Sequence, residues 1–178
     1  MNIYFTLICC LLCTTLFGCQ SREDAGHAEK NIKHLESRHI DQHKNFVETG
    51  DDLPISHIVD VNGNSINLND PTKRKLIILF ATWCHDSNRA LKALNVSPIL
   101  NDSSIEIIAI AREETKDTVI AWRDEHNIKV QLAVDVDRSI YEKFSDGGIP
   151  RMVTVGKDNK IIKMNLAEGD NQLALIQW

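Results

Sequence analysis

The stretch from Lys75 to Leu94 constrains the fold most, because an uninterrupted apolar run is followed at once by a helical pattern. Leu76 to Phe80 contains no polar residue, which is typical of a strand covered on both faces inside a mixed or parallel sheet. Apolar side chains then recur at helical spacing over residues 88–94. The sequence therefore predicts a buried strand, a short turn and a helix, with Cys84 in the first turn of that helix.

The predicted position of Cys84 favours a reactive thiolate. Unpaired amide N–H groups and a dipole equivalent to roughly half a positive charge stabilise an anion at a helix N-terminus. The alternative is a buried, inert sulfur that packs as a small hydrophobe. Ser87, three residues on, is spaced to donate a hydrogen bond to a Cys84 thiolate, or is simply a small polar residue in the first turn.

The remaining pattern alternates strands and helices, which predicts an α/β fold. Residues 57–61 and 65–68 flank Asn62-Gly63 and predict a hairpin with a tight turn. The order strand, helix, strand after Lys75 predicts a parallel crossover. Further strands are predicted at 105–111, 130–134, 152–155 and 161–164, and further helices at 117–126, around 140–144 and at 170–178.

Two motifs carry a resemblance to a known family. Trp83-Cys84-His85-Asp86-Ser87 resembles the Trp-Cys-x-x-Cys active site of the thioredoxin superfamily, with Ser87 in place of the second cysteine. Gly148-Ile149-Pro150 resembles the loop whose cis-proline packs beside the reactive sulfur in that family. From about residue 53 to 166 the chain is similar to the envelope-tethered TlpA-like (redoxin) branch of thiol-disulfide oxidoreductases. This implies a thioredoxin-like fold, a central mixed sheet with flanking helices and an N-terminal β-hairpin.

The same resemblance implies a function and a site. Cys84 would attack a disulfide in an exported, cysteine-containing protein, as a monothiol oxidoreductase or isomerase, with Ser87 beside it in the catalytic site. Another thiol donor would release the mixed disulfide, because a serine hydroxyl cannot do so. Trp83, Ile149 and Pro150 would contact the substrate. We predict neither a cofactor nor a metal ion.

Two other functions are consistent with parts of the sequence. A thioredoxin fold that has lost turnover would be a binding module for peptides or proteins in the bacterial envelope. It is an alternative because the second cysteine, which would release a mixed disulfide, is missing. Many TlpA-like proteins also have an acidic proton acceptor where this chain has Ala90, so the resemblance does not extend to a proton relay. A peroxidase of the peroxiredoxin type would need proline at Ile77 and threonine at Ala81, and both are absent.

The N-terminus predicts export and a lipid anchor. Residues 1–18 are uncharged and largely apolar, and are too short for a comfortable membrane span but suited to a signal peptide. Leu16-Phe17-Gly18-Cys19 resembles a bacterial lipoprotein signal, in which Cys19 would be lipidated. An ordinary signal peptide and an uncleaved anchor are the alternatives. We predict a signal peptide at 1–18, a polar tether at 19–52 and a thioredoxin-like domain at 53–178, held at the envelope membrane and facing the periplasm or the outer surface.

Cysteine positions and charge narrow the chemistry further. Of the five cysteines, only Cys84 would remain as a free thiol after export and lipidation, because the others are Cys9, Cys10, Cys13 and Cys19. A net charge of −5 argues against nucleic acid as a partner.

Three other polar features are interpreted without a functional role. His39 and His43 lie one turn apart, but no neighbouring thiolate or carboxylate completes a metal site, so we interpret them as tether histidines. Arg112 and Arg151 could bind an anionic substrate, but we expect both to be solvated.

Overall fold

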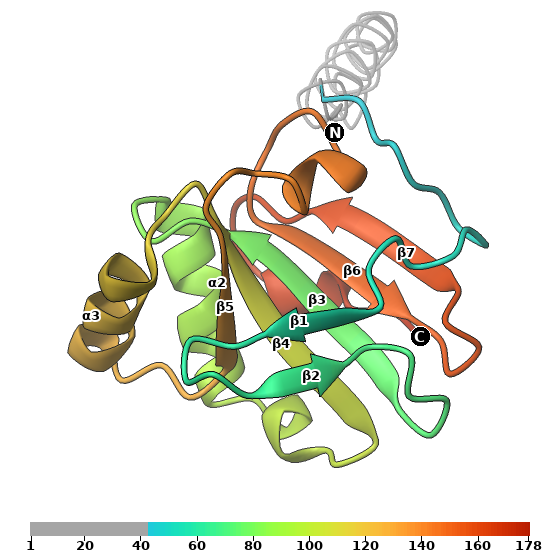
Figure 1. The fold of residues 1–178 in the computed structure, drawn as a ribbon, viewed down its shortest axis with the longest axis horizontal. Coiled ribbons are helices and arrows are strands. Elements are labelled where there is room, and N and C mark those ends of the chain that lie inside the picture. The colour runs from blue at the N-terminus through green and yellow to red at the C-terminus, as the bar shows by residue number, and fades with distance from the viewer. Residues whose placement is uncertain (1–42) are drawn as a thin grey trace, which may run out of the picture. The chain divides into compact units, whose positions relative to one another are not determined.

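The computed structural model describes residues 43–178. Its main sheet is mixed and five-stranded, with strand order β5-β4-β3-β6-β7. Residues 1–42, which include the predicted signal peptide, Cys19 and His39, lie outside the described part of the chain. The strands are β3 (Arg74–Phe80), β4 (Ile105–Arg112), β5 (Gln131–Asp135), β6 (Arg151–Val155) and β7 (Ile161–Leu166) (Figure 1).

The central strand β3 explains why its sequence shows no alternation. It pairs in parallel with β4 and antiparallel with β6, as the predicted crossover requires. Leu76, Ile78 and Phe80 point into one apolar layer, whereas Ile77 and Leu79 point into another. Both faces are covered, so every position from Leu76 to Phe80 is buried.

Different elements cover the two faces. The helices α2 (His85–Asn95) and α3 (Lys116–His126) pack on the layer that contains Phe80. On the other face lies the two-stranded hairpin of β1 (His57–Val59) and β2 (Ser65–Asn67), which crosses in front of the main sheet in Figure 1. In the described residues, no helix is long and apolar enough to cross a membrane.

Two predicted helices differ from the structure. Around residues 140–144 only a single 3₁₀ turn forms, η3 (Tyr141–Lys143). The closing helix predicted at 170–178 is wrong, because this segment contains only η4 (Gln172–Leu175). Asn171 precedes it with a φ of 58°. The buried Gln172 side chain donates to the carbonyl oxygens of Asp86 and Ala167, and this inward contact replaces a longer surface helix.

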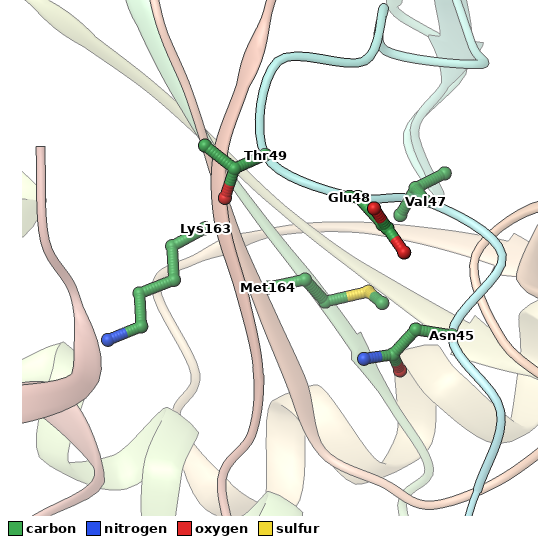
Figure 2. A pocket seen from close by; sticks show the side chains of 6 residues that line it. All are labelled: Asn45, Val47, Glu48, Thr49, Lys163 and Met164. Carbon is green, nitrogen blue, oxygen red and sulfur yellow. The ribbon is translucent and has the colours of Figure 1, made fainter.

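Residues 43–52, which the sequence analysis assigns to the tether, contact the domain directly. The N–H of Gly50 donates to the Ile161 carbonyl oxygen at 2.8 Å, and Thr49 Oγ1 donates to that of Ile162 at 2.9 Å. Val47 is buried in the core, whereas Phe46 is 47% exposed. A pocket of about 430 Å³ lies between this segment and β7, as Figure 2 shows, and is lined by Asn45, Val47, Glu48, Thr49, Lys163 and Met164.

Candidate functional site

Cys84 lies where the chain leaves the carboxyl end of β3 and enters α2. It is the N-cap residue of α2, with extended backbone dihedrals, and its side chain makes no capping hydrogen bond. The thiol is half-buried and is the free cysteine of the described residues. Its Sγ lies 3.7 Å from the carbonyl oxygen of Ile149, to which the S–H can donate. The sulfur therefore lies at a helix N-terminus, as predicted, and is in contact with the Ile149-Pro150 loop.

Ser87 is fully buried beneath the first turn of α2. Its Oγ accepts a hydrogen bond from the Ala81 N–H at 3.4 Å. This bond joins the helix to the end of β3 instead of joining the hydroxyl to Cys84. The proposed donation from Ser87 to a Cys84 thiolate therefore stays a prediction, and a packing role for Ser87 has a specific contact behind it.

The predicted substrate-contacting residues gather around Cys84 but differ in exposure. Trp83, the neighbour of Cys84 in the chain, is 66% exposed. Ile149 and Pro150 are buried and joined by a cis peptide bond, as the motif predicted. The large exposed indole is therefore the part of this set that a macromolecule could cover.

A buried carboxylate near the cysteine was not found by sequence analysis. Glu114, just beyond β4, is 8% exposed and accepts two hydrogen bonds from Thr82. The Thr82 N–H donates to Oε2 at 2.8 Å, and the Thr82 hydroxyl donates to Oε1. Because β3 and β4 are parallel, their carboxyl ends lie at one edge of the sheet, which is how residues 32 positions apart meet. This chain has Ala90 where TlpA-like proteins often have an acidic residue. A carboxylate from another position, that of Glu114, is bonded to the turn that carries Cys84.

A second polar contact fixes the same turn from the helix side. Asn88 Nδ2 donates to the carbonyl oxygens of Thr82 at 2.6 Å and Cys84 at 2.8 Å. Trp122 on α3 donates its Nε1–H to Asn88 Oδ1 at 2.9 Å. Residues 82–84 are thus held by hydrogen bonds from both sides. No sequence spacing signals this network, because Asn88 and Trp122 each fit an ordinary amphipathic helix.

Arg151 is not solvated, contrary to expectation. It is fully buried at the start of β6, directly after Pro150. Its Nε donates to the Gly147 carbonyl oxygen at 2.9 Å and to the Tyr141 hydroxyl at 3.3 Å. Arg112 is not solvated either: only 15% of its side chain is exposed, and its guanidinium carbon lies 4.8 Å from the centre of the Tyr141 ring. Both arginines are parts of the structure that surrounds the Ile149-Pro150 loop.

A metal centre is not assembled in the described region. Across residues 43–178, no group of three or more His, Cys, Asp or Glu side chains is placed to hold an ion. His43 lies 3.6 Å from Asp146, so its imidazole is in contact with a carboxylate of the domain.

Comparisons with known proteins agree with this geometry. No family model matches the chain. Over 127 residues it is 25% identical to the thiol-disulfide oxidoreductase ResA of Bacillus cereus, which covers 70% of this chain and 73% of that protein. A solution structure from Bacteroides thetaiotaomicron, described as a protein disulfide isomerase, superimposes with a TM-score of 0.67 at 22% identity, over 73% of this chain and 86% of that chain. The chain is thus similar to thiol-disulfide oxidoreductases over most of its length, and its fold is thioredoxin-like.

The thioredoxin-like fold predicted from the sequence is confirmed by a further structure. The thioredoxin domain of a thiol-disulfide oxidoreductase from Bacteroides vulgatus matches with a TM-score of 0.59 at 19% identity, over 72% of this chain and 94% of that chain. The mixed sheet, the flanking helices and the N-terminal hairpin are the expected ones. In this thioredoxin-like domain, Cys84 occupies the junction of central strand and helix at which the superfamily has its active-site motif.

Proposed function

We propose that this protein is an envelope thiol-disulfide oxidoreductase or isomerase that acts through Cys84 alone. One observation carries the proposal: Cys84 is a half-buried N-cap cysteine whose sulfur contacts the Ile149-Pro150 loop. The general activity is supported by relatives that are named thiol-disulfide oxidoreductases. The monothiol mode is inferred from Ser87, which stands where the superfamily motif has its second cysteine.

The reaction follows from one sulfur. The Cys84 thiolate attacks one sulfur of a client disulfide, a bond forms between them, and the other client sulfur leaves as a thiolate. If that client thiolate, or a different one in the same client, attacks the mixed disulfide, the client disulfide is restored or moved and no electrons are exchanged. If two external thiols take part instead, they supply two electrons, the client is reduced and they end as a disulfide. Ser87 can take neither part, because an alcohol does not cleave a disulfide.

The local structure supports nucleophilic attack by Cys84. Amide N–H groups at the start of α2 lack helical partners and attract a thiolate. The hydrogen bonds from Asn88 and to Glu114 hold the turn that carries the sulfur, so the geometry for attack is prepared before a client arrives. Trp83, with two thirds of its surface exposed, supplies an apolar contact for the client chain.

The second candidate function is a redox-inactive binding module. It is favoured by the hydrogen bond that the Ser87 hydroxyl accepts, because a buried serine bonded to Ala81 N–H is explained by packing alone. In such a module Trp83 and the Ile149-Pro150 loop would bind an extended peptide, and Cys84 would have no chemical role. The two functions differ in whether Cys84 reacts in the folded protein.

Trapping experiments separate these functions. The full chain is expressed in a bacterium that exports it to the cell envelope. Thiol-disulfide exchange is stopped with acid, which protonates the thiolates, and proteins are separated on non-reducing gels. We expect mixed disulfides with exported proteins that disappear with reductant and are absent in Cys84→Ala. The purified folded protein should also be alkylated by iodoacetamide. Alkylation only after denaturation, together with no trapped adducts, would overturn the enzyme and leave the binding module.

We further propose that the protein is a lipoprotein anchored through Cys19, with residues 20–42 leading toward the domain. The support is the apolar leader and the Leu16-Phe17-Gly18-Cys19 junction. Anchoring at the envelope places Cys84 in an oxidising compartment, where exported proteins form disulfides. Its clients would be cysteine-containing exported proteins.

A further inference from the structure

We propose that the segment from His43 to Phe46, here called the strap, positions the loop from Ser145 to Pro150, here called the proline loop. The strap residues Asn45 and His43 act as positioning residues for the part of the loop that faces Cys84. Any effect of the strap on substrate binding rests on the function proposed above, whereas the contact between strap and loop does not.

The strap is bonded to the proline loop along its backbone. Lys44 N–H donates to Asp146 Oδ1 at 2.8 Å, and Asp146 N–H donates back to the Lys44 carbonyl oxygen at 3.1 Å. Ser145 Oγ donates to the same Lys44 oxygen at 2.8 Å. Asn45 and Ser145 form a β-bridge, so the strap lies beside the loop as a short added strand.

Arg151 links the strap to the loop through its buried guanidinium. Its Nη1 donates to Asn45 Oδ1 at 2.8 Å, and its Nε donates to the Gly147 carbonyl oxygen at 2.9 Å. The Tyr141 hydroxyl donates to the next carbonyl oxygen along the loop, that of Gly148, at 2.6 Å. A guanidinium has only hydrogen-bond donors, so when it is buried the acceptor that Asn45 provides helps to hold it in this orientation.

His43 packs directly on the glycines of the loop. A Cβ atom at Gly147 would lie 2.3 Å from His43 Nδ1, and one at Gly148 would lie 2.8 Å from His43 Cδ2. Non-bonded heavy atoms do not approach a Cβ atom this closely in proteins. The imidazole therefore occupies space that a side chain at either position would need. Gly147 has no left-handed backbone, so alanine there would not be strained by φ but would require the His43 imidazole to move.

The hydrogen-bonded part of the proline loop extends to the carbonyl group beside Cys84. The carbonyl oxygens of Gly147 and Gly148 are held by Arg151 and Tyr141, and the next carbonyl oxygen, that of Ile149, lies 3.7 Å from Cys84 Sγ. Releasing the strap should therefore loosen the loop at the point where a client chain would pass the sulfur. Residues before position 53 thus contribute to the site as well as to the tether.

The first experiment compares Asn45→Ala with the matched control Asn69→Ala in the full chain. The exposed Asn69 also accepts one side-chain hydrogen bond, from the half-buried Asn159, which belongs to neither strap nor loop. In Asn45→Ala we expect amide exchange of the proline loop to become about tenfold faster, as when one hydrogen bond to a buried charge is lost. Peptides from α3 should be unchanged, and Asn69→Ala should leave the loop as in the wild type. Unchanged loop exchange in Asn45→Ala would overturn the proposal.

The second experiment uses the clash at Gly147. Gly147→Ala should displace the strap and speed loop exchange, whereas Gly147→Ala combined with His43→Ala should restore slower exchange than Gly147→Ala alone, because the new methyl group then has room. If the double variant exchanges as fast as Gly147→Ala, the imidazole is not what the glycine accommodates, and the proposal fails.

A third measurement distinguishes this inference from the proposed function. If the protein turns over a peptide disulfide, Asn45→Ala should raise KM more than it lowers kcat, because the strap acts on the loop and not on the sulfur. Faster loop exchange in a protein that turns over nothing would support the strap and reject the enzyme. A fall in kcat alone, with loop exchange and KM unchanged, would reject the strap.

Discussion

Cys84 and Ser87 lie one helical turn apart but in different environments. Cys84 is half-buried and touches the Ile149 carbonyl oxygen, whereas Ser87 is fully buried and accepts from Ala81 N–H. The pair keeps the position of a dithiol site while only one of its members can react with a disulfide. Substitution at Ser87 therefore tests whether the missing sulfur is all that separates this site from a dithiol enzyme.

Ser87→Cys should create a dithiol that turns over. A sulfur one turn from Cys84 converts release of the mixed disulfide from an intermolecular into an intramolecular step, which is strongly favoured. With an external thiol supplied to reduce the internal disulfide again, reduction of a protein disulfide should then proceed with turnover. The wild type should instead accumulate as the mixed disulfide, which only a slower intermolecular attack by that thiol can release. Mass spectrometry after mild oxidation should show an internal disulfide. Its absence would mean that positions 84 and 87 do not share the required geometry, and Ser87→Ala provides the control without sulfur.

Lys75 is a residue whose burial costs stability. It is fully buried in β3, and its Nζ has no hydrogen-bond partner within residues 43–178. Burial lowers the pKa of Lys75 below 10.5, against the opposing attraction of Asp70 and Asp158. Because the unfolded chain binds this proton more tightly, the cost is fully present below the folded pKa and is relieved as the pH rises toward 10.5.

Lys75→Met should stabilise the protein by about 1 to 3 kcal/mol at pH 7, since an unsatisfied buried donor is replaced by an apolar chain of similar length. Urea unfolding at pH 7 and at about pH 10 should show a gain that shrinks at the higher pH. Lys73→Met is the control, because Lys73 pairs with Glu106 at 2.7 Å and its loss should cost stability. A less stable Lys75→Met would contradict this account.

At the scale of the elements, the β1–β2 hairpin shows how a side chain builds a turn. The buried Asp60 carboxylate accepts the N–H groups of Asn62 and Asn64 at 2.8 Å each, and the Asn64 side chain at 2.9 Å. Gly63, with a φ of 92°, completes a loop wider than the two-residue turn that Asn62-Gly63 predicted. Val61 N–H then donates to the Leu132 carbonyl oxygen at 2.7 Å, which attaches the hairpin to β5.

Asp60→Ala should lower the free energy of unfolding by about 1.5 to 3 kcal/mol at pH 7, the range for hydrogen bonds to a charged group. Burial alone would raise the pKa of Asp60, but the hydrogen bonds from Asn64 and Asn62 outweigh it and lower the pKa below 3.8. Because the folded pKa is depressed, this stabilisation is present above 3.8 and is lost as the pH falls through the folded pKa.

Urea unfolding across the acid range is the measurement. The difference in unfolding free energy between wild type and Asp60→Ala should narrow as the pH falls below 3.8 toward the folded pKa. Protonation of the wild-type carboxylate then removes the charge that strengthens its hydrogen bonds. Asp70, which is less buried than Asp60 and is bonded to Thr72, provides the matched control, and Asp70→Ala should have the smaller effect. Equal effects at the two positions would show that the turn carboxylate is not a specific stabiliser.

At the scale of the whole molecule, the chain before residue 53 divides into a part that is hydrogen-bonded to the domain and a part assigned to the tether. Residues 43–52 are bonded to it, with Gly50 N–H donating to the Ile161 carbonyl oxygen and Phe46 N–H to that of Phe144. Residues 19–42 belong to the proposed tether. A lipid at Cys19 would therefore connect the membrane to a segment that itself contacts the proline loop.

Cys19→Ala should abolish lipidation and release the protein from the membrane. Lipidation adds acyl chains whose burial holds a protein at the bilayer, and the substituted junction cannot be acylated. Intact mass and membrane fractionation of wild type and variant provide the measurement. A mature wild-type protein that starts elsewhere, or a variant processed and bound as before, would exclude the anchor.

Local patterns in the sequence were enough to determine the strands, the helices α2 and α3 and the place of Cys84. A doubly covered strand needs an apolar residue at every position, and a helix start has its own signals, so Leu76–Phe80 and residues 84–94 carry their structure in their own side chains. The cis-proline loop and the thioredoxin-like fold could likewise be predicted from Gly148-Ile149-Pro150 and Trp83-Cys84. The closing helix was mispredicted because apolar spacing does not report the inward turn of Gln172.

Only the tertiary structure decided which distant polar groups meet. Glu114 reaches Thr82 because two parallel strands end at one edge, and Asn45 reaches Arg151 across 106 positions because the strap lies along the proline loop. Such pairs have no period in the sequence, since their contact depends on strand order and packing and not on spacing. The reactive sulfur could therefore be found from the sequence, while the hydrogen bonds that hold its surroundings could be found only from the fold.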